Sequence, residues 1–333
     1  MTAPPLCAAP PLPKARGEVS AAVLDRLTAH PRTRTGPMTV PVPEDPYGDD
    51  LQLSLYLLYE LHYRGFEGVD DRLEWDPDLL RLRAALEERF LAALRDGVPR
   101  GGGAEEELAA LMDAPPDGKG SVSHHLLRQG ELWQLREYAA LRSLYHLKEA
   151  DPHLWVVPRL RGRAKAGMVS VEYDEFGAGR AEEIHARLYA DLLDDLRLTS
   201  AYGAYLDAAP AEMLAIVTMM SLFGLHRSRR GALVGHFAAV EVTSSPASAR
   251  MADALRRCGA GEAAQRFYDE HVEADAVHEQ LVRHEVVAGL LADEPQLEGD
   301  VVFGIRATGL LEGRLADLLL ASWQAGHGVL RTS

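Results

Sequence analysis

The chain is poor in cysteine, with only Cys7 and Cys258 among its 333 residues. One stands near the amino terminus and the other lies in a stretch of helical pattern, so the sequence does not predict a disulfide framework. A metal site built on cysteine sulfur is excluded for the same reason. Low cysteine content is typical of proteins from a reducing compartment, and we expect a cytoplasmic location.

Long apolar runs and excess positive charge are also lacking. No stretch of about 18 uninterrupted apolar residues is present, and the proline-rich start does not have the pattern of a signal peptide. The 35 Lys and Arg residues against 50 Asp and Glu residues give a net charge of -15. Because a phosphate backbone requires a basic surface, this balance argues against nucleic-acid binding. We expect a soluble protein with neither nucleic acid nor membrane as partner.

Strand patterns are missing as well, since no segment shows sustained alternation bounded by hairpin turns. Apolar residues instead recur at three and four positions along most of the chain. The sequence therefore predicts an all-α fold with a bundle of about seven long core helices. These helices are expected at residues 130–150, 153–165, 168–196, 210–228, 230–258, 261–291 and 299–326.

Composition divides the chain into three parts. Residues 1–46 are rich in proline and are expected to be partly disordered, apart from a short helix near 17–29. Residues 47–120 are predicted to form an N-terminal helical extension that ends in a glycine run and a PPDG turn. Residues 121–333 are predicted to form the main domain. Two helices are expected in the extension, at 49–66 and at 76–97, with Asp76 as the N-cap of the second.

The most informative stretch is AQRFYDEHVEADAVHEQLVRHEV, residues 264–286. His271, Asp275 and His278 are spaced so that all three fall within an arc of roughly 60° on one helix face. Each residue alone is more simply interpreted as a core histidine or a solvated charge. Three ligand-type side chains that interrupt an apolar stripe indicate a metal site, provided that a second helix supplies further ligands.

The stretch EYDEFGAGRAEEIH, residues 172–185, offers that second helix. The spacing of Glu175, Glu182 and His185 puts them within roughly 80° on one face of a continuous helix. On this interpretation the helix runs through Gly177 and Gly179, whose small size leaves room for a neighbouring helix or the substrate to lie close to the backbone. The alternative is a plain loop between two surface helices.

A third predicted helix adds Glu149 to these residues. Four carboxylates and three histidines are too many for one metal ion but suit two, with carboxylates bridging. Structural zinc fits less well, because such sites usually close with sulfur or histidine. The predicted ligands are Glu149, Glu175, Glu182, His185, His271, Asp275 and His278.

Three segments in this order resemble the haem-oxygenase-like diiron oxidases and oxygenases, also called iron-containing redox enzymes. They are WVVPRLRGRAKAGMVSVEYDEFGAGRAEEIH, SLFGLHRSRRGALVGHFAAVEVTSS and FYDEHVEADAVHEQL. The resemblance implies a haem-oxygenase-like catalytic domain over residues 121–333, with an amino-terminal helical extension like that of the longer members. It also implies two Fe(II) ions as cofactor and O2 as cosubstrate. The catalytic residues it implies are Glu149, Glu175, His185, His271, Asp275 and His278, with Glu182 as a further ligand.

The resemblance implies oxidation of a small amino acid or amine in specialised metabolism. We favour C–H cleavage of an aliphatic α-amino acid, giving desaturation, C–C scission or a small ring such as an azetidine. Open alternatives are N-oxygenation of an amine or guanidine, a helical enzyme that handles haem or another cofactor without iron of its own, and a metal-binding or structural helical protein. A homodimer and an external electron donor are also expected.

Substrate contacts are weaker predictions. Arg306 could clamp a carboxylate through its planar fork, and Glu241 could receive an amine, although each could equally serve in an ordinary ion pair. The remaining histidines, His146 among them, are interpreted as core or surface residues. The GAG run at 177–179 is not a dinucleotide fingerprint, because no strand precedes it and no GxGxxG is completed.

Overall fold

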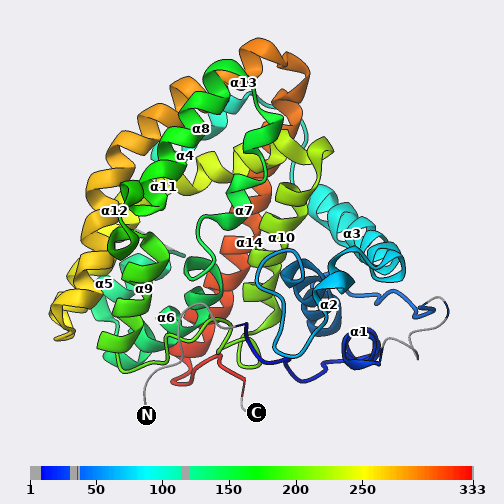
Figure 1. Ribbon diagram of the computed structural model, residues 1–333. Helices are drawn as coiled ribbons and strands as arrows, with labels where there is room; N and C mark the ends of the chain where they lie inside the picture. The colour runs from blue at the N-terminus through cyan, green and yellow to red at the C-terminus, as the bar shows by residue number, and fades with distance from the viewer. Residues whose placement is uncertain (1–8, 31–35, 37, 114–119, 332–333) are drawn as a thin grey trace.

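The computed structural model describes residues 9–30, 36, 38–113 and 120–331, and for positions 273, 275 and 276 it describes the backbone alone. Within these ranges every regular element is a helix and there is no strand, which confirms the predicted all-α fold (Figure 1). None of the helices in the described part of the chain is long and apolar enough to cross a membrane.

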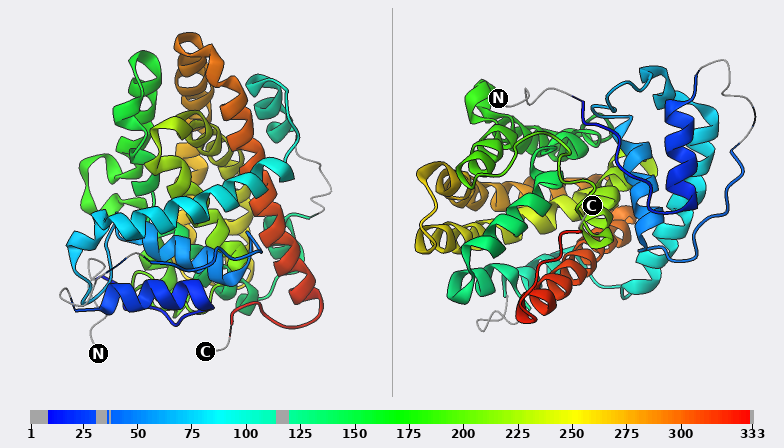
Figure 2. Two further views of the ribbon diagram at one scale, coloured as in Figure 1. Left: turned by 90° about the vertical axis from the view of Figure 1, so that its right-hand side faces the viewer. Right: turned by 90° about the horizontal axis from the view of Figure 1, so that it is seen from below.

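The first helices form a group at one side of the molecule, away from α12 (Figures 1 and 2). Asp50 holds two of them together, since its carboxylate accepts from the backbone N–H groups of Val19 and Ser20 at 3.0 and 2.8 Å. Asp76 caps the third helix as predicted, by accepting from Leu79 N at 3.0 Å. The elements of this group are α1 (Glu18–Thr28), α2 (Asp49–Glu60), a 3₁₀ turn (Asp71–Trp75) and α3 (Pro77–Gly97).

The centre of the bundle is helix α10 (Ala211–Leu225). Helix α10 is apolar on all sides and almost completely buried, so it serves as the centre against which α2 and α14 pack. The bounds of the helices are α4 (Ala104–Met112), α5 (Val122–Gln129), α6 (Leu132–His146), α7 (Asp151–Leu154), α8 (Gly162–Glu175), α9 (His185–Asp195), α10 (Ala211–Leu225), α11 (Arg230–Arg257), α12 (Glu262–Leu281), α13 (Ala288–Asp293) and α14 (Glu298–Gln324).

Helices α11 and α14 approach each other through glycine. A Cβ added to Gly235 would overlap the carbonyl oxygen of Val301, and one added to Gly304 would overlap that of Ala232. Two backbones can lie this close only when neither carries a side chain at the crossing. The crossing fixes α11 against α14 and so places the middle of α11, with Glu241, in the interior of the bundle.

Two predicted helices are wrong as continuous elements. The expected helix at 153–165 is interrupted by a 3₁₀ turn (Val157–Arg159) containing Pro158, because proline cannot donate to a helical ladder and restricts the residue before it. The expected helix at 168–196 ends at Glu175 and resumes at His185, with 3₁₀ turns at Gly177–Gly179 and Ala181–Glu183. The helix expected at 261–291 is helical throughout but contains a π segment (Val282–Val287).

Candidate metal centre

The break between α8 and α9 brings two predicted ligands together. Glu175 is the last residue of α8, and His185 is the first residue of α9. Gly177 lies between them with φ of 72°, and a Cβ there would stand 2.7 Å from the carbonyl carbon of Glu183 and from the amide nitrogen of Ile184. Only glycine permits this return of the chain. As a result, His185 Nδ1 lies 2.7 Å from Glu175 Oε2.

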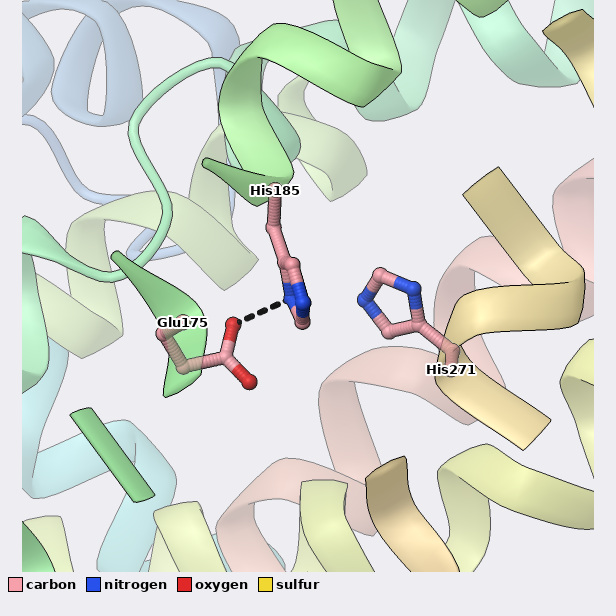
Figure 3. Close-up of side chains that lie close together, drawn as sticks. All are labelled: Glu175, His185 and His271. Atoms are coloured by element: carbon pink, nitrogen blue, oxygen red, sulfur yellow. Dashed lines mark ion pairs between the residues drawn. The ribbon is translucent and has the colours of Figure 1, made fainter. Parts of the chain in front are cut away.

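His271 of α12 completes a first group of ligand-type side chains, which point toward one another in Figure 3. One ligand atom from each of Glu175, His185 and His271 lies within 4.8 Å of the other two, and all three residues are buried. His271 Nδ1 donates to the Phe267 carbonyl oxygen at 2.7 Å, so Nε2 carries the lone pair of the neutral ring. Metal-bound histidines commonly make such a bond with the second ring nitrogen.

Glu241 and His278 form a second buried group with the same Glu175. His278 Nδ1 lies 3.3 Å from Glu241 Oε2 and 3.8 Å from Glu175 Oε1. On the other side of the ring, Nε2 lies 3.2 Å from the carboxylate of Asp174. A neutral His278 that donates from Nε2 to Asp174 presents its Nδ1 lone pair to two carboxylates. A cation among these three groups would be coordinated by this nitrogen lone pair and by oxygens of the two carboxylates.

The donor set fits two divalent metal ions. Glu175 belongs to both groups and directs Oε2 toward His185 and Oε1 toward His278. A carboxylate that turns one oxygen to each of two sites has the arrangement of a bridging ligand in dinuclear carboxylate centres. Carboxylate oxygen with imidazole nitrogen, and no sulfur, suits iron or manganese better than structural zinc.

Glu172 is a carboxylate beside the centre that sequence reasoning missed. It lies one turn before Glu175 on α8, is 2% exposed, and has no hydrogen-bond partner for either carboxyl oxygen within the described part of the chain. Burial, together with the nearby charges of Glu175 and Glu241, raises the pKa of Glu172 well above its ordinary value. The spacing of Glu172 and Glu175 was the available signal, because residues three apart share a helix face.

Glu149 stands in the turn after α6, with a histidine beside it. His146 Nδ1 lies 2.9 Å from Glu149 Oε2, and both side chains are largely buried. Burial, and next the charges of Arg142 and His271, lower the pKa of His146 well below its ordinary value. A neutral His146 therefore donates its Nδ1 proton to Glu149 and orients that carboxylate. His146 is thus a largely buried histidine, in keeping with the interpretation as a core residue, and it positions a predicted ligand.

Three predicted ligands do not belong to either described group, namely Glu149, Glu182 and Asp275. Glu149 stands in the turn after α6 beside His146. Glu182 is exposed on the 3₁₀ turn before α9, because its placement with Glu175 required a continuous helix that is broken here. The side chain of Asp275 lies outside the described residues. The assignment of these three as ligands stays a prediction.

The two predicted substrate residues differ in outcome. Arg306 of α14 pairs with Glu107 of α4 at 2.5 Å and donates to the Pro99 carbonyl oxygen, so its guanidinium is engaged by α4 and the segment before it, and it joins neither ligand group. Glu241 is 6% exposed and lies within the second ligand group, where it is better placed to hold a metal ion than to receive an amine.

A cavity of about 360 Å³ lies beside the first ligand group, with Glu149 and His271 in its lining. Near these two residues the wall is aromatic, since the ring of Phe267 lies 4.3 Å from that of His271 and 5.0 Å from that of Tyr268, which also lines the cavity. Hydroxyl groups from α11 and a charged pair complete the lining. Its volume is at the lower end of the usual range for ligand pockets, about 300–1,000 Å³, and suits a small molecule.

The fold and centre define an all-helical protein with two buried carboxylate and histidine groups that share one glutamate. A family model described as iron-containing redox enzyme matches residues 136–313, which is more than half of the chain and includes both groups. The chain belongs to this family, and its bundle is a haem-oxygenase-like iron redox domain. A separate comparison with curated proteins found no match.

Proposed function

We propose that this protein is an O2-dependent diiron enzyme that oxidises a small amino acid or amine. The observation that carries the proposal is the sharing of Glu175 by two buried ligand groups. Within this proposal we favour C–H cleavage of an aliphatic α-amino acid, with desaturation, C–C scission or closure of a small ring such as an azetidine. The aromatic wall beside His271 supports this preference, because it offers a hydrocarbon chain a better environment than a charged amine.

The residues of the chain have separate roles in this proposal. His185 and His271 would hold one iron, Glu241 and His278 would hold the other, and Glu175, which belongs to both groups, would contribute to each. Bound ferrous ions supply the electrons that reduce O2. The bonds from His271 to a backbone carbonyl and from His278 to Asp174 fix the ring orientations, and Glu149 lines the cavity together with His271.

Protection from bulk water is the second contribution of the protein. All five of these ligands are at most 6% exposed, and α9, α11 and α12 surround them. A buried centre strengthens metal–carboxylate attraction and limits side reactions of the activated oxidant. The cavity of about 360 Å³ lies beside the centre, and the substrate would bind in it.

An anaerobic titration with Fe(II) tests the proposal. We expect two equivalents to bind, and O2 consumption by the loaded protein to rise with a substrate found in a screen of amino acids and amines. Mass analysis of the product separates loss of hydrogen or carbon from N-oxygenation, which adds oxygen at nitrogen. Iron binding at adventitious levels only, with haem binding instead, would favour the alternative of a cofactor-handling enzyme.

We propose a homodimer, a cytoplasmic location, and an external electron donor that returns the centre to the ferrous state. Analytical ultracentrifugation of the iron-loaded protein checks the first, fractionation of the native host the second, and turnover with and without added reductant the third.

A further inference from the structure

The cavity beside the centre contains an ion pair in its wall. Arg142 comes from α6 and Glu312 from α14, and Arg142 Nη1 lies 2.8 Å from Glu312 Oε1. The Arg142 side chain is 12% exposed and that of Glu312 is 39% exposed. Both residues line the same space as Glu149 and His271. A cation and an anion therefore stand side by side, in one cavity with two predicted iron ligands.

The guanidinium of Arg142 is only partly used. Nη1 donates to Glu312, whereas the buried Nε has no hydrogen-bond partner among the residues that the structure describes. The group stacks near the rings of Tyr145 and Tyr138, at 4.9 and 6.0 Å from their centroids. These rings hold the guanidinium by cation–π attraction without occupying its donors. Burial disfavours its charged form, yet Glu312 keeps the pKa of Arg142 well above its ordinary value.

We infer that Arg142 and Glu312 bind the charged head group of an α-amino acid, with the carboxylate on Arg142 and the ammonium beside Glu312, while the side chain extends toward Glu149 and His271. This inference rests on the proposed function and names the substrate class and the residues that select it. The planar fork of arginine matches a carboxylate through two parallel hydrogen bonds.

The pairing of charges is what makes the inference specific. An arginine alone would select any carboxylate, and a glutamate alone would select any amine. An α-amino acid carries both charges on neighbouring atoms, and the adjacent Arg142 and Glu312 are complementary to it. Because the cavity is about 360 Å³, the ligand is of single amino-acid size. Arg142 therefore takes the role of binding the substrate carboxylate, which the sequence analysis considered for Arg306.

The test is calorimetric titration into the full-length protein, metal-free and anaerobically loaded with Fe(II). The probes are the twenty protein L-amino acids, followed by the amine and the carboxylic acid obtained from the best binder by removing one charged group. We expect the amino acid to bind at least about tenfold more tightly than either derivative, since each lost charged hydrogen bond costs about that factor or more.

Variants locate the effect. Arg142→Met and Glu312→Gln are each expected to weaken amino-acid binding about ten- to a hundredfold while two equivalents of iron still bind. Arg230→Met is the matched control, because Arg230 forms a similarly buried pair with Glu294 that does not line this cavity. Circular dichroism verifies that each variant is folded.

Three outcomes overturn the inference: no amino acid binds at millimolar concentration, a derivative lacking one charge binds as well as the amino acid, or both cavity variants bind like the wild type. None of these affects the iron titration, so they leave the proposed function standing. Failure to bind iron with normal amino-acid binding would reject the proposed function instead and leave the head-group site intact.

Discussion

Lys148→Met should strongly destabilise the protein, because it leaves a buried carboxylate without its counter-charge. Lys148 is 2% exposed, and Glu60 of α2 is 0% exposed. The ammonium donates to Glu60 Oε2 and lies 4.3 Å from the centroid of the Tyr63 ring. Methionine preserves most of the volume of the lysine stem, so lost packing contributes little to the effect.

The magnitude follows from the contacts that remain. Glu60 would keep the Tyr202 hydroxyl at 2.9 Å, the Arg64 backbone N–H at 3.3 Å and the Tyr56 hydroxyl, but all three are neutral donors. Two unit charges about 4 Å apart attract by about 4 kcal/mol at an effective dielectric constant of 20. Removing one partner of a buried pair costs about 3–5 kcal/mol in comparable cases. We expect a loss of this size in the free energy of unfolding.

Urea unfolding of the metal-free protein, followed by circular dichroism at 222 nm, measures this loss. The double variant Glu60→Gln with Lys148→Met should recover a large part of it, because the buried charge is then gone and the introduced amide keeps a hydrogen bond to Tyr202. A loss below about 1 kcal/mol for Lys148→Met would refute the reasoning. So would a double variant whose loss equals the sum of the single losses.

Three further changes test the site and its surroundings. Glu175→Ala and His278→Ala should each abolish O2-dependent turnover with nearly unchanged helix content; full activity in either variant would contradict the ligand assignment. Gly177→Ala should cost about 2–4 kcal/mol of unfolding free energy from positive φ and overlap with the returning chain, whereas Gly179→Ala, where the added Cβ would meet, among the described residues, only the Tyr173 hydroxyl at 3.8 Å, should cost about 1 kcal/mol. Burial lowers the pKa of His153 to about 4, so the unfolded chain binds more protons between that value and about 6.5. Stability should therefore fall as the pH drops through this window, and urea titrations of His153→Gln at several pH values should give a slope shallower by up to about 1.4 kcal/mol per pH unit; an unchanged slope would show that His153 does not titrate in this way.

Much of the fold could be predicted because it depends on local patterns. Apolar periodicity located the helices that became α3, α10, α11 and α14, and the Asp76 cap marked the start of α3. Such signals are encoded within one or two turns of helix, so they survive without knowledge of the tertiary structure. The prediction of one continuous helix over residues 168–196 was wrong because it, too, depended on local patterns alone. The apolar spacing was periodic on both sides of the break, and the alternative of a loop at Gly177 and Gly179 was closer to the structure, in which Gly177 adopts positive φ.

In the metal centre, too, local patterns predicted where residues lie on a helix, whereas tertiary contacts decided which residues meet. Helical spacing placed His271 and His278 on one face of α12, and each of them belongs to one of the two ligand groups. The pairing of Glu175 with His185 was expected on the wrong premise, since the two meet across a turn and not along a helix. Glu241 could not be recognised as part of the centre. Its place depends on the close crossing of α11 and α14, which no local pattern in α11 encodes.

The sequence by itself determined the residue types of the centre and the helices that present them, because ligand chemistry and helix formation are properties of side chains and short segments. Its motifs also indicated the family. Only the tertiary structure decided which carboxylates gather around Glu175, that Arg306 pairs with Glu107 of α4, and that Arg142 and Glu312 meet in the cavity. These are contacts between residues far apart in the chain, fixed by how whole helices pack and where the backbone turns back on itself.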